Sequence, residues 1–338
     1  MKLIVTGGAG FIGSCFIRMA LNERWADRVV NLDKLTYAGN LENLESVSSH
    51  PGYQFVHADI CDRETVENLF AREAPDAIIH FAAESHVDRS IHLPAPVIKT
   101  NVEGTFTLLE AARQYKIPRF IHVSTDEVYG SIDPPHEAIE TDPLRPSSPY
   151  SASKASSDLL ALSYYTTYKL NVCVTRASNN YGPYQFPEKL IPLMISNALE
   201  EKPLPVYGDG QQVRDWLYVE DHCRAVFCVL QKGEPGEIYN IGGNCSLPNI
   251  EVVRRILKAT HKPESLIAWV ADRPGHDRRY ALSSEKLKRL TGWSPQMDFD
   301  RGLAVTIEWY QRNRQWVEHV KSGEYRHFYE LNYTNRAI

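Results

Sequence analysis

Short apolar runs alternate with amphipathic stretches through the first half of the chain. Residues 3–6 are apolar, residues 11–22 place apolar side chains at helical spacing, and residues 28–32 are apolar again before Asp33. This order predicts a strand, a helix and a second strand, the unit that joins two parallel strands. The alternation continues, with strands expected at 53–59, 77–83, 119–125 and 171–178 and helices at 61–74, 95–115 and 149–169.

Several of these predicted strands are rich in β-branched residues throughout, instead of alternating between apolar and polar residues. Such strands are typical of a parallel sheet that helices cover on both faces. We therefore predict an α/β fold with a Rossmann-type, doubly wound parallel sheet.

The regular alternation ends after Tyr181, where five prolines fall between residues 183 and 205. Further helices are expected at 188–201, 220–231, 249–261, 283–290 and 300–314, and a strand at 237–243 is expected to return to the sheet. We therefore assign residues 1–182 and 211–247 to the sheet domain. Residues 183–210 and 248–338 are expected to form a smaller, mostly helical lobe.

The composition is that of an ordinary globular protein, with 43% hydrophobic and 23% charged residues in a chain of 338. A net charge of −5 gives no indication of nucleic-acid binding. The chain begins directly with a predicted strand, and we find no signal peptide or membrane span. Six cysteines without a CxxC pair predict reduced thiols and a cytoplasmic location. The twelve histidines show no metal-binding spacing, so we expect no metal.

A glycine-rich loop follows the first predicted strand. Gly7, Gly10 and Gly13 allow a tight turn and a close approach of the backbone to a pyrophosphate, which the N-terminus of the next helix would bind. Asp33 ends the second strand, 20 residues after Gly13. A carboxylate there accepts hydrogen bonds from a ribose 2′-OH and repels a 2′-phosphate. The loop therefore predicts NAD in preference to NADP, although neighbouring Lys34 weakens that preference.

Tyr150 and Lys154 are four residues apart and lie on one face of a predicted helix. A nearby ammonium favours the phenolate and would lower the pKa of the phenol toward neutrality. We therefore expect Tyr150 to act as a base toward an alcohol proton.

These motifs together resemble the extended short-chain dehydrogenase/reductase superfamily, on the residues TGGAGFIG, Ser124-Thr125 and YSASK. The resemblance implies that Thr125 hydrogen-bonds the sugar hydroxyl that is oxidised and that Lys154 also holds the nicotinamide ribose. The cofactor contacts that it implies are Gly7, Gly10, Phe11, Ile12, Gly13, Asp33, Lys34, Thr36, Asp59, Ile60, Ala82, Ala83, Thr100, Tyr150, Lys154 and Asn179.

Two adjacent acids, Asp126 and Glu127, follow Thr125 at the end of a predicted strand. Beside Tyr150 they would supply a base for a carbon-bound proton and an acid for a departing hydroxyl, as a dehydration requires. Two carboxyls in one partly dry pocket titrate apart, so one is expected to stay protonated. The Thr-Asp-Glu sequence resembles the nucleotide-sugar 4,6-dehydratases, and the simple epimerases of the superfamily lack the acidic pair.

The resemblance extends along nearly the whole chain to the dTDP-glucose 4,6-dehydratases, through segments 80–91, 100–105, 178–192, 206–222 and 272–281 and the closing SGEYRHFYELNYTNR. It implies that the sheet domain binds NAD, that the smaller lobe binds dTDP-glucose, and that the product is the 4-keto-6-deoxy sugar. The substrate contacts that it implies are Ser85, His86, Thr125, Asn180, Lys189, Leu190, Pro205, Tyr207, Arg214, Asn249, Arg273, His276 and Tyr280.

Several alternatives stay open at this point. Val206, Gln211 and Gln212 depart from the family pattern near the base, which leaves UDP-, CDP- or GDP-hexose as other substrates. A 4-epimerase or a decarboxylase could be built on the same scaffold, and a cofactor-sensing regulator is a candidate outside the enzymes. The resemblance also implies a homodimer through a four-helix bundle formed by helices 95–115 and 149–169.

Overall fold

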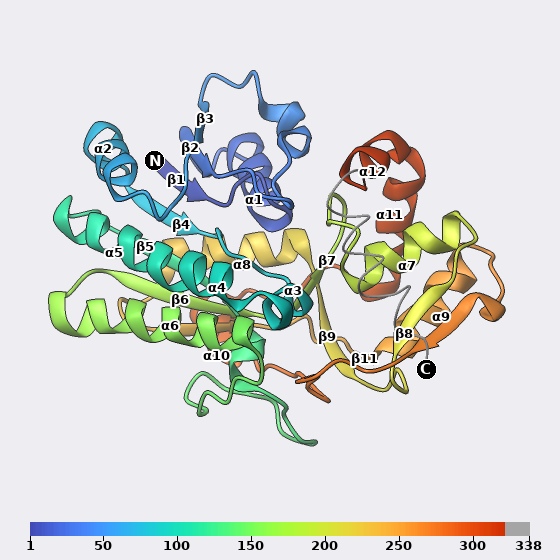
Figure 1. The fold of residues 1–338 in the computed structure, drawn as a ribbon. Helices are drawn as coiled ribbons and strands as arrows, with labels where there is room; N and C mark the ends of the chain where they lie inside the picture. Colours follow the sequence, from blue (N-terminus) through green and yellow to red (C-terminus); the bar gives the residue numbers. More distant parts are fainter. Residues whose placement is uncertain (322–338) are drawn as a thin grey trace.

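A seven-stranded parallel sheet forms the centre of the larger body in the computed structural model, which describes residues 1–321 (Figure 1). Every neighbouring pair of strands in this sheet is parallel, which confirms the predicted α/β, Rossmann-type fold. Residues 237–243 return to the sheet as predicted, as strand β10. Across the sheet the strands are β10 (Ile238–Ile241), β6 (Val172–Ala177), β5 (Phe120–Thr125), β4 (Ala77–His80), β1 (Lys2–Thr6), β2 (Arg28–Asp33) and β3 (Tyr53–His57).

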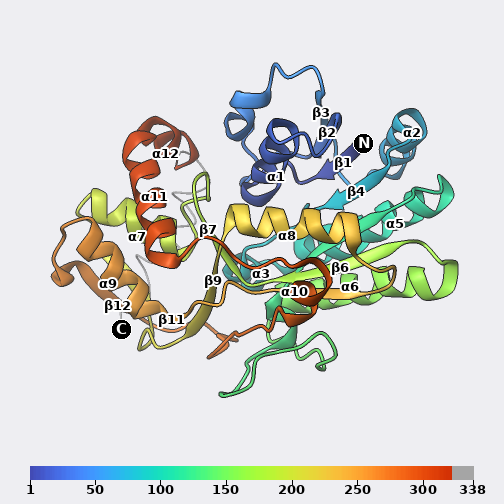
Figure 2. The same ribbon diagram turned by 180° about the vertical axis from the view of Figure 1, so that it is seen from behind.

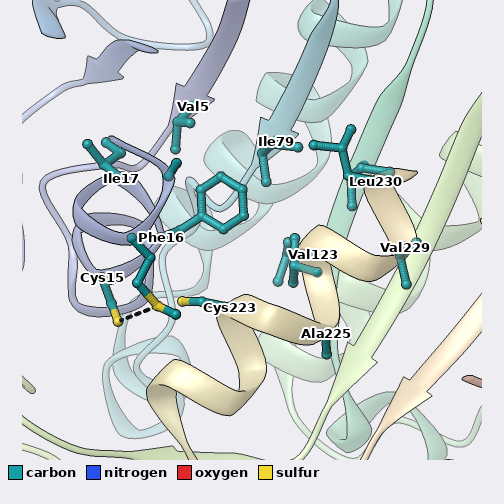
Figure 3. Close-up of a cluster of buried hydrophobic side chains, with 14 of the residues drawn as sticks. Val5, Cys15, Phe16, Ile17, Ile79, Val123, Cys223, Ala225, Val229 and Leu230 are labelled. Atoms are coloured by element: carbon teal, nitrogen blue, oxygen red, sulfur yellow. Dashed lines mark hydrogen bonds between the residues drawn. The ribbon is translucent and has the colours of Figure 1, made fainter. Parts of the chain in front are cut away.

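Helices cover both faces of this sheet, because its strands are apolar on both sides. In β1, Leu3 and Val5 join one buried cluster, and Ile4 between them joins the cluster on the opposite face. Figure 3 shows part of the first cluster, where the ring of Phe16 lies near Val5 and Ile79 of the sheet and Cys223 points toward Cys15. The first face is covered by α1 (Phe11–Asn22), α8 (Val219–Lys232) and α10 (Glu285–Thr291), and the second by α2 (Arg63–Glu73), α5 (Thr105–Gln114) and α6 (Pro149–Tyr168).

The segment predicted as one helix over 95–115 contains a π-helical turn in the structure. After α3 (Val87–His92) and α4 (Pro94–Ile98), a π-helical turn, η2 (Lys99–Gly104), precedes α5. The side chain of Asn101 in this turn bonds both the backbone nitrogen and the carbonyl oxygen of Glu84, at 2.8 and 3.0 Å. The backbone stays helical from residue 94 to residue 114, so the long predicted helix is present, with a π-helical turn that the periodicity of the sequence did not indicate.

A smaller body lies beside the sheet domain, and β7 and β9 run between the two (Figures 1 and 2). Its apolar core joins residues of its helices and strands. The sequence predicted the helices Leu190–Leu199, Asn249–Ala259 and Phe299–Arg312, but neither the helix Arg314–Val320 nor the short strands. The elements are β7 (Asn179–Tyr181), α7 (Leu190–Leu199), β8 (Leu204–Tyr207), β9 (Val213–Tyr218), β11 (Ser246–Pro248), α9 (Asn249–Ala259), β12 (Ile267–Val270), α11 (Phe299–Arg312) and α12 (Arg314–Val320).

The described residues also form three short 3₁₀ helices: η1 (Leu41–Val47), η3 (Asp126–Tyr129) and η4 (Glu264–Leu266). Over residues 1–321, no helix is both long and apolar enough to cross a membrane. All six cysteines are free thiols. The closing segment SGEYRHFYELNYTNR lies outside the described residues, as does the part of the predicted smaller lobe that follows residue 321.

Candidate active site

The loop between β1 and α1 requires glycine at two positions. Gly7 has a φ of +69°, and a Cβ there would lie 2.5 Å from the backbone nitrogen of Ala82. A Cβ on Gly13 would lie 2.3 Å from the carbonyl oxygen of Gly7, so α1 starts directly against β1. Gly10, the residue before α1, has no side chain to cap the helix. The first N–H groups of α1 are therefore available to an anion.

The acidic residue at the end of β2 is held by the loops on either side. Asp33 accepts hydrogen bonds from the backbone nitrogens of Ala9, at 2.9 Å, and Leu35, at 2.8 Å. Neighbouring Lys34 forms an ion pair with Asp59 at 2.7 Å. The charge of Lys34 is therefore balanced by a carboxylate, which weakens the sequence-based argument that Lys34 would favour a 2′-phosphate.

One cavity follows the carboxyl ends of β1 to β6, where the strand order reverses between β1 and β4. Open α/β sheets bind their ligands at this place. The cavity is lined by every residue that the sequence predicted to contact the cofactor: Gly7, Gly10, Phe11, Ile12, Gly13, Asp33, Lys34, Thr36, Asp59, Ile60, Ala82, Ala83, Thr100, Tyr150, Lys154 and Asn179.

The wall of this cavity suits a polar dinucleotide. Oδ1 of Asn179 and Oδ2 of Asp126 are buried and have no hydrogen-bond partner within residues 1–321. Such atoms are nearly always satisfied in native proteins, so they are available to a ligand. Within residues 1–321, and apart from the chain neighbours of Gly10, the one atom closer than 4 Å to a Cβ on Gly10 would be the carbonyl oxygen of Gly7, at 3.3 Å. The open space there lets a ligand approach the backbone closely.

Tyr150 and Lys154 lie one turn apart on α6, and both side chains are buried. The Lys154 ammonium donates to the carbonyl oxygen of Val123 at 2.8 Å, and burial lowers the pKa of Lys154 to about 8. Burial, and then the charges of Glu127 and Asp126, raise the pKa of Tyr150. The expected fall of the phenol pKa was therefore wrong for the protein's own groups. Desolvation and two carboxylates outweigh an ammonium that is hydrogen-bonded to the backbone.

The acidic pair begins η3, the turn that follows β5. Asp126 is 3% exposed and Glu127 is partly buried, and both line the cavity together with Tyr150. Burial raises the pKa of both carboxyls, and the charge of Glu127 raises that of Asp126 further. The cations of Arg273, Lys189 and Arg214 oppose the rise at Glu127. Asp126 is thus the carboxyl more strongly held in its protonated form, which agrees with the expected division between an acid and a base.

Part of the predicted substrate set lines the same cavity. Lys189 donates to the carbonyl oxygen of Ser85 at 2.8 Å, which joins the segment before α7 to the end of β4. Asn180 lies 2.9 Å from Nδ1 of His222 through its side-chain oxygen. The substrate residues on the cavity wall are Ser85, Thr125, Asn180 and Lys189.

A second polar cluster joins α3 to the smaller body. Asp88 is 4% exposed and accepts from Arg273 at 3.0 Å and from the hydroxyl of Tyr207 at 2.9 Å. The ring of Tyr207 meets His276 edge-on at 6.0 Å. Nε of Arg273 is buried without a partner among the described residues. Because Arg273 is the cation that most lowers the pKa of Glu127, this cluster lies close to the acidic pair.

The other predicted substrate residues do not line the first cavity. The Arg214 guanidinium stacks 4.2 Å from the ring centre of Tyr280 and donates to the carbonyl oxygen of Asp277. His86 caps α3 and accepts from the backbone nitrogen of Arg89 at 3.3 Å, so it serves the local structure. Pro205 lies in β8, Leu190 begins α7 and Asn249 begins α9.

The comparisons with known proteins agree with this geometry. Residues 4–306 match the family model described as GDP-mannose 4,6 dehydratase. The dTDP-glucose 4,6-dehydratase 1 of Escherichia coli K12 is 54% identical, over 99% of this chain and 100% of the relative. The dTDP-glucose 4,6-dehydratase of Streptomyces venezuelae, solved with NAD bound, superposes with a TM-score of 0.93 at 51% identity over 95% of this chain and all of that one.

This chain belongs to the dTDP-glucose 4,6-dehydratase family. An NAD complex of the UDP-glucose 4-epimerase of Thermus thermophilus also superposes well, with a TM-score of 0.86, but at 33% identity over 93% of this chain and all of that one. The fold is therefore shared with epimerases. The fold by itself thus does not separate a dehydratase from an epimerase.

Sequence reasoning about this dehydratase-family chain missed Glu188, which lines the cavity beside Lys189. Glu188 is 4% exposed, and burial raises its pKa to about 7. It accepts from the hydroxyl of Tyr37 at 3.0 Å, and the guanidinium of Arg89 lies 3.6 Å from the ring centre of Tyr37. An acid between a proline and a lysine reads as a solvated loop residue, so only the tertiary structure reveals its position.

Proposed function

We propose that the protein converts dTDP-glucose to dTDP-4-keto-6-deoxyglucose and regenerates its NAD in each cycle. One observation carries this reading: the buried acidic pair lines the same cavity as Tyr150 and Lys154. A 4-epimerase needs only the exchange of a hydride at C4. An acid and a base beside that centre supply what water removal needs in addition.

The first step is oxidation at C4. Thr125 orients the 4-hydroxyl, Tyr150 accepts its proton, and the Lys154 ammonium favours the phenolate. The raised pKa of Asp126 favours its neutral form, in which only the charge of Glu127 still opposes this proton transfer. NAD held by the β1–α1 loop and Asp33 would supply the hydride acceptor for C4 and the hydride donor for C6.

Elimination follows, because the new C4 ketone acidifies the C5 proton. Glu127 removes this proton while Asp126 protonates the C6 oxygen, and water leaves. After the hydride reaches C6, the protonated Glu127 returns a proton to C5, which leaves a 6-deoxy sugar with a ketone at C4. The two carboxyls thus need opposite protonation states at the start of this step, as their unequal pKa shifts favour.

The proposed binding residues divide between the two bodies. NAD would lie on the β1–α1 loop, with its ribose on Asp33 and its nicotinamide near Tyr150 and Lys154. Residues 1–182 and 211–247 would form this NAD-binding domain, apart from β7, β9 and β11, whose side chains pack in the core of the smaller body. Residues 183–210 and 248–338 would form the lobe for the nucleotide sugar. Arg214 and Arg273 suit a diphosphate, because a guanidinium matches phosphate oxygens in a bidentate manner.

We also propose that two chains pair in a four-helix bundle, through the helical segment 95–115 (α4 to α5), the helix α6 and their symmetry mates. Large apolar side chains are exposed on this side, including Ile98 at 47%, Phe106 at 45% and Leu159 at 59%. Such a patch is typical of an interface. The free cysteines fit a reducing cytoplasm.

The acidic pair provides the decisive test. Asp126→Asn combined with Glu127→Gln should still allow C4 oxidation but should stop water loss, because neither proton transfer has a group to perform it. The reaction is followed through reduced nicotinamide on the enzyme and through the alkali-sensitive 4-keto-6-deoxy product. A control, Glu45→Gln combined with Asp133→Asn, removes two exposed carboxylates elsewhere and should leave turnover unchanged. Unimpaired water loss in the first variant would exclude the assigned roles, and a wild-type enzyme that inverts C4 without losing water would be an epimerase.

A further inference from the structure

A continuous line of buried polar side chains lies behind the candidate catalytic residues. Asp158 on α6 accepts from Nε of Arg176 on β6 at 2.8 Å, and Nη1 of Arg176 donates to the hydroxyl of Tyr129 at 2.8 Å. Tyr129 in turn donates to the side-chain oxygen of Asn240 on β10 at 2.8 Å. Each of these four side chains is at most 1% exposed. We call Asp158, Arg176, Tyr129 and Asn240 the polar relay.

The polar relay reaches from the helix that bears the oxidation groups to the turn that bears the elimination groups. Asp158 lies one turn beyond Lys154, and Tyr150, Lys154 and Asp158 repeat at every fourth residue of α6. Tyr129 is the last residue of η3, the turn whose first two residues are the acidic pair. The relay therefore connects the helix of the oxidation groups to the turn of the elimination groups through the sheet.

The turn η3 has weak internal support. Thr125 Oγ1 accepts from the backbone nitrogen of Glu127 at 3.3 Å, and the carbonyl oxygen of Glu127 accepts from Gly130 at 3.3 Å. Asp126 receives its bond from Thr125 at 3.3 Å as well. These distances exceed those of good hydrogen bonds, and 3₁₀ geometry is intrinsically poorer. The bonds of the relay are all shorter, at 2.8 Å.

We propose that the polar relay positions the acidic pair against Tyr150 and Lys154, so that the groups for oxidation and for elimination address the same sugar ring. This inference rests on the proposed function. None of the relay residues lines the cavity, so we treat them as positioning residues. Charge-assisted bonds in a dry interior are rigid and polarise one another, which suits them to fix the distance between two elements.

The alternative is that the polar relay serves only the folding of the protein and does not position the acidic pair. A buried ion pair can contribute to folding alone, and its loss would then slow every step in proportion to the folded fraction. A positioning role predicts a selective loss. Oxidation depends on α6 and on the bond from Lys154 to Val123, which the relay does not form. Elimination depends on η3, so it alone should suffer when the relay is broken at Tyr129.

The test uses Tyr129→Phe, which keeps the ring and removes the hydroxyl that links Arg176 to Asn240. The control is Tyr239→Phe, which removes another buried tyrosine hydroxyl, one that accepts from the backbone nitrogen of Glu234 at 2.8 Å outside the relay. Rates of reduced-nicotinamide formation and of 4-keto-6-deoxy sugar formation are measured in single turnovers with dTDP-glucose. The thermal midpoints of both variants are measured alongside.

For Tyr129→Phe we expect oxidation at close to the wild-type rate, elimination slowed about tenfold to a hundredfold, and an accumulation of reduced nicotinamide with the 4-ketoglucose nucleotide. Tyr239→Phe should lose a similar amount of thermal stability, but it should accumulate neither reduced nicotinamide nor the 4-ketoglucose nucleotide. Equal slowing of both steps, or identical behaviour of the two variants, would overturn the relay. A wild-type enzyme that forms no 4-keto-6-deoxy sugar would instead refute the proposed function, so the two failures are distinguishable.

Discussion

The two halves of the site are built in different ways. The half proposed for NAD is formed by consecutive strand ends of one sheet and by a glycine loop whose backbone contacts are fixed by local sequence. The half proposed for the nucleotide sugar is assembled from α3, β8 and the segment around Arg273, held together by side-chain bonds to Asp88. Backbone geometry fixes the first half, whereas buried charges fix the second. We therefore expect steric substitutions of the backbone to weaken the NAD half, and removal of a charge to weaken the nucleotide-sugar half.

The largest effect is expected where the two halves meet. Tyr150→Phe removes the group that accepts the 4-hydroxyl proton, so C4 oxidation should slow about 10³-fold. The rate of reduced-nicotinamide formation in a single turnover measures this step. Tyr181→Phe, a buried tyrosine of the smaller body whose hydroxyl bonds the carbonyl oxygen of Phe299, serves as the control and should oxidise C4 normally. Oxidation at the wild-type rate in Tyr150→Phe would remove the phenol from the mechanism.

A backbone clash should disable the NAD half. Gly7→Ala places a Cβ 2.5 Å from the backbone of Ala82, so the loop must shift, and NAD should bind about 100-fold more weakly. Gly292→Ala is the matched control. Gly292 also has a positive φ, of 77°, but in the described part of the chain no atom outside its own neighbourhood lies within 4 Å of the added Cβ. It should cost about 1 kcal/mol of stability and leave NAD affinity unchanged. Calorimetric titration with NAD and thermal unfolding compare the two variants. Equal losses of affinity would mean that strain, and not the clash, governs the loop.

Loss of a buried cation should weaken the nucleotide-sugar half. Arg273→Met removes a guanidinium proposed for the diphosphate and leaves Asp88 without its ion partner, so KM for dTDP-glucose should rise about 30-fold. Arg278→Met, nearby in sequence, breaks an ion pair with Asp209 in which both side chains are more than half exposed, and KM should stay unchanged. Steady-state kinetics decide between them. An unchanged KM in Arg273→Met would place the diphosphate elsewhere.

The smallest expected effect is a pH dependence. Lys154 is cationic below its pKa of about 8 and loses its proton above it, so kcat should fall as the pH rises through this value. At that pH about half of the cation, and hence about half of the rate, should remain. In Lys154→Arg the residual activity should lack this alkaline decline, because a guanidinium keeps its proton. A decline at the same pH in Lys154→Arg would assign the titration to another group.

The sequence alone determined the sheet, the glycine loop and the acids at the end of β5. Each of these depends on residues close together in the chain: β-branched runs for strands, spaced glycines for a turn, and a strand end that presents Asp126 and Glu127. Strands of three to six residues in the smaller body, such as β7 and β9, were not predicted. Their pairing partners are distant in the chain, so no local pattern of hydrophobic residues predicts them.

Only the tertiary structure determined the protonation states of the site residues and which residues lie beside them. Spacing placed Tyr150 beside Lys154, but burial and two nearby carboxylates determine the direction of the phenol pKa. Glu188 lies in the cavity wall, where it accepts a hydrogen bond from Tyr37, a residue 151 positions away in the chain. Desolvation and long-range pairing depend on what the fold packs around a group, and a linear pattern contains neither quantity.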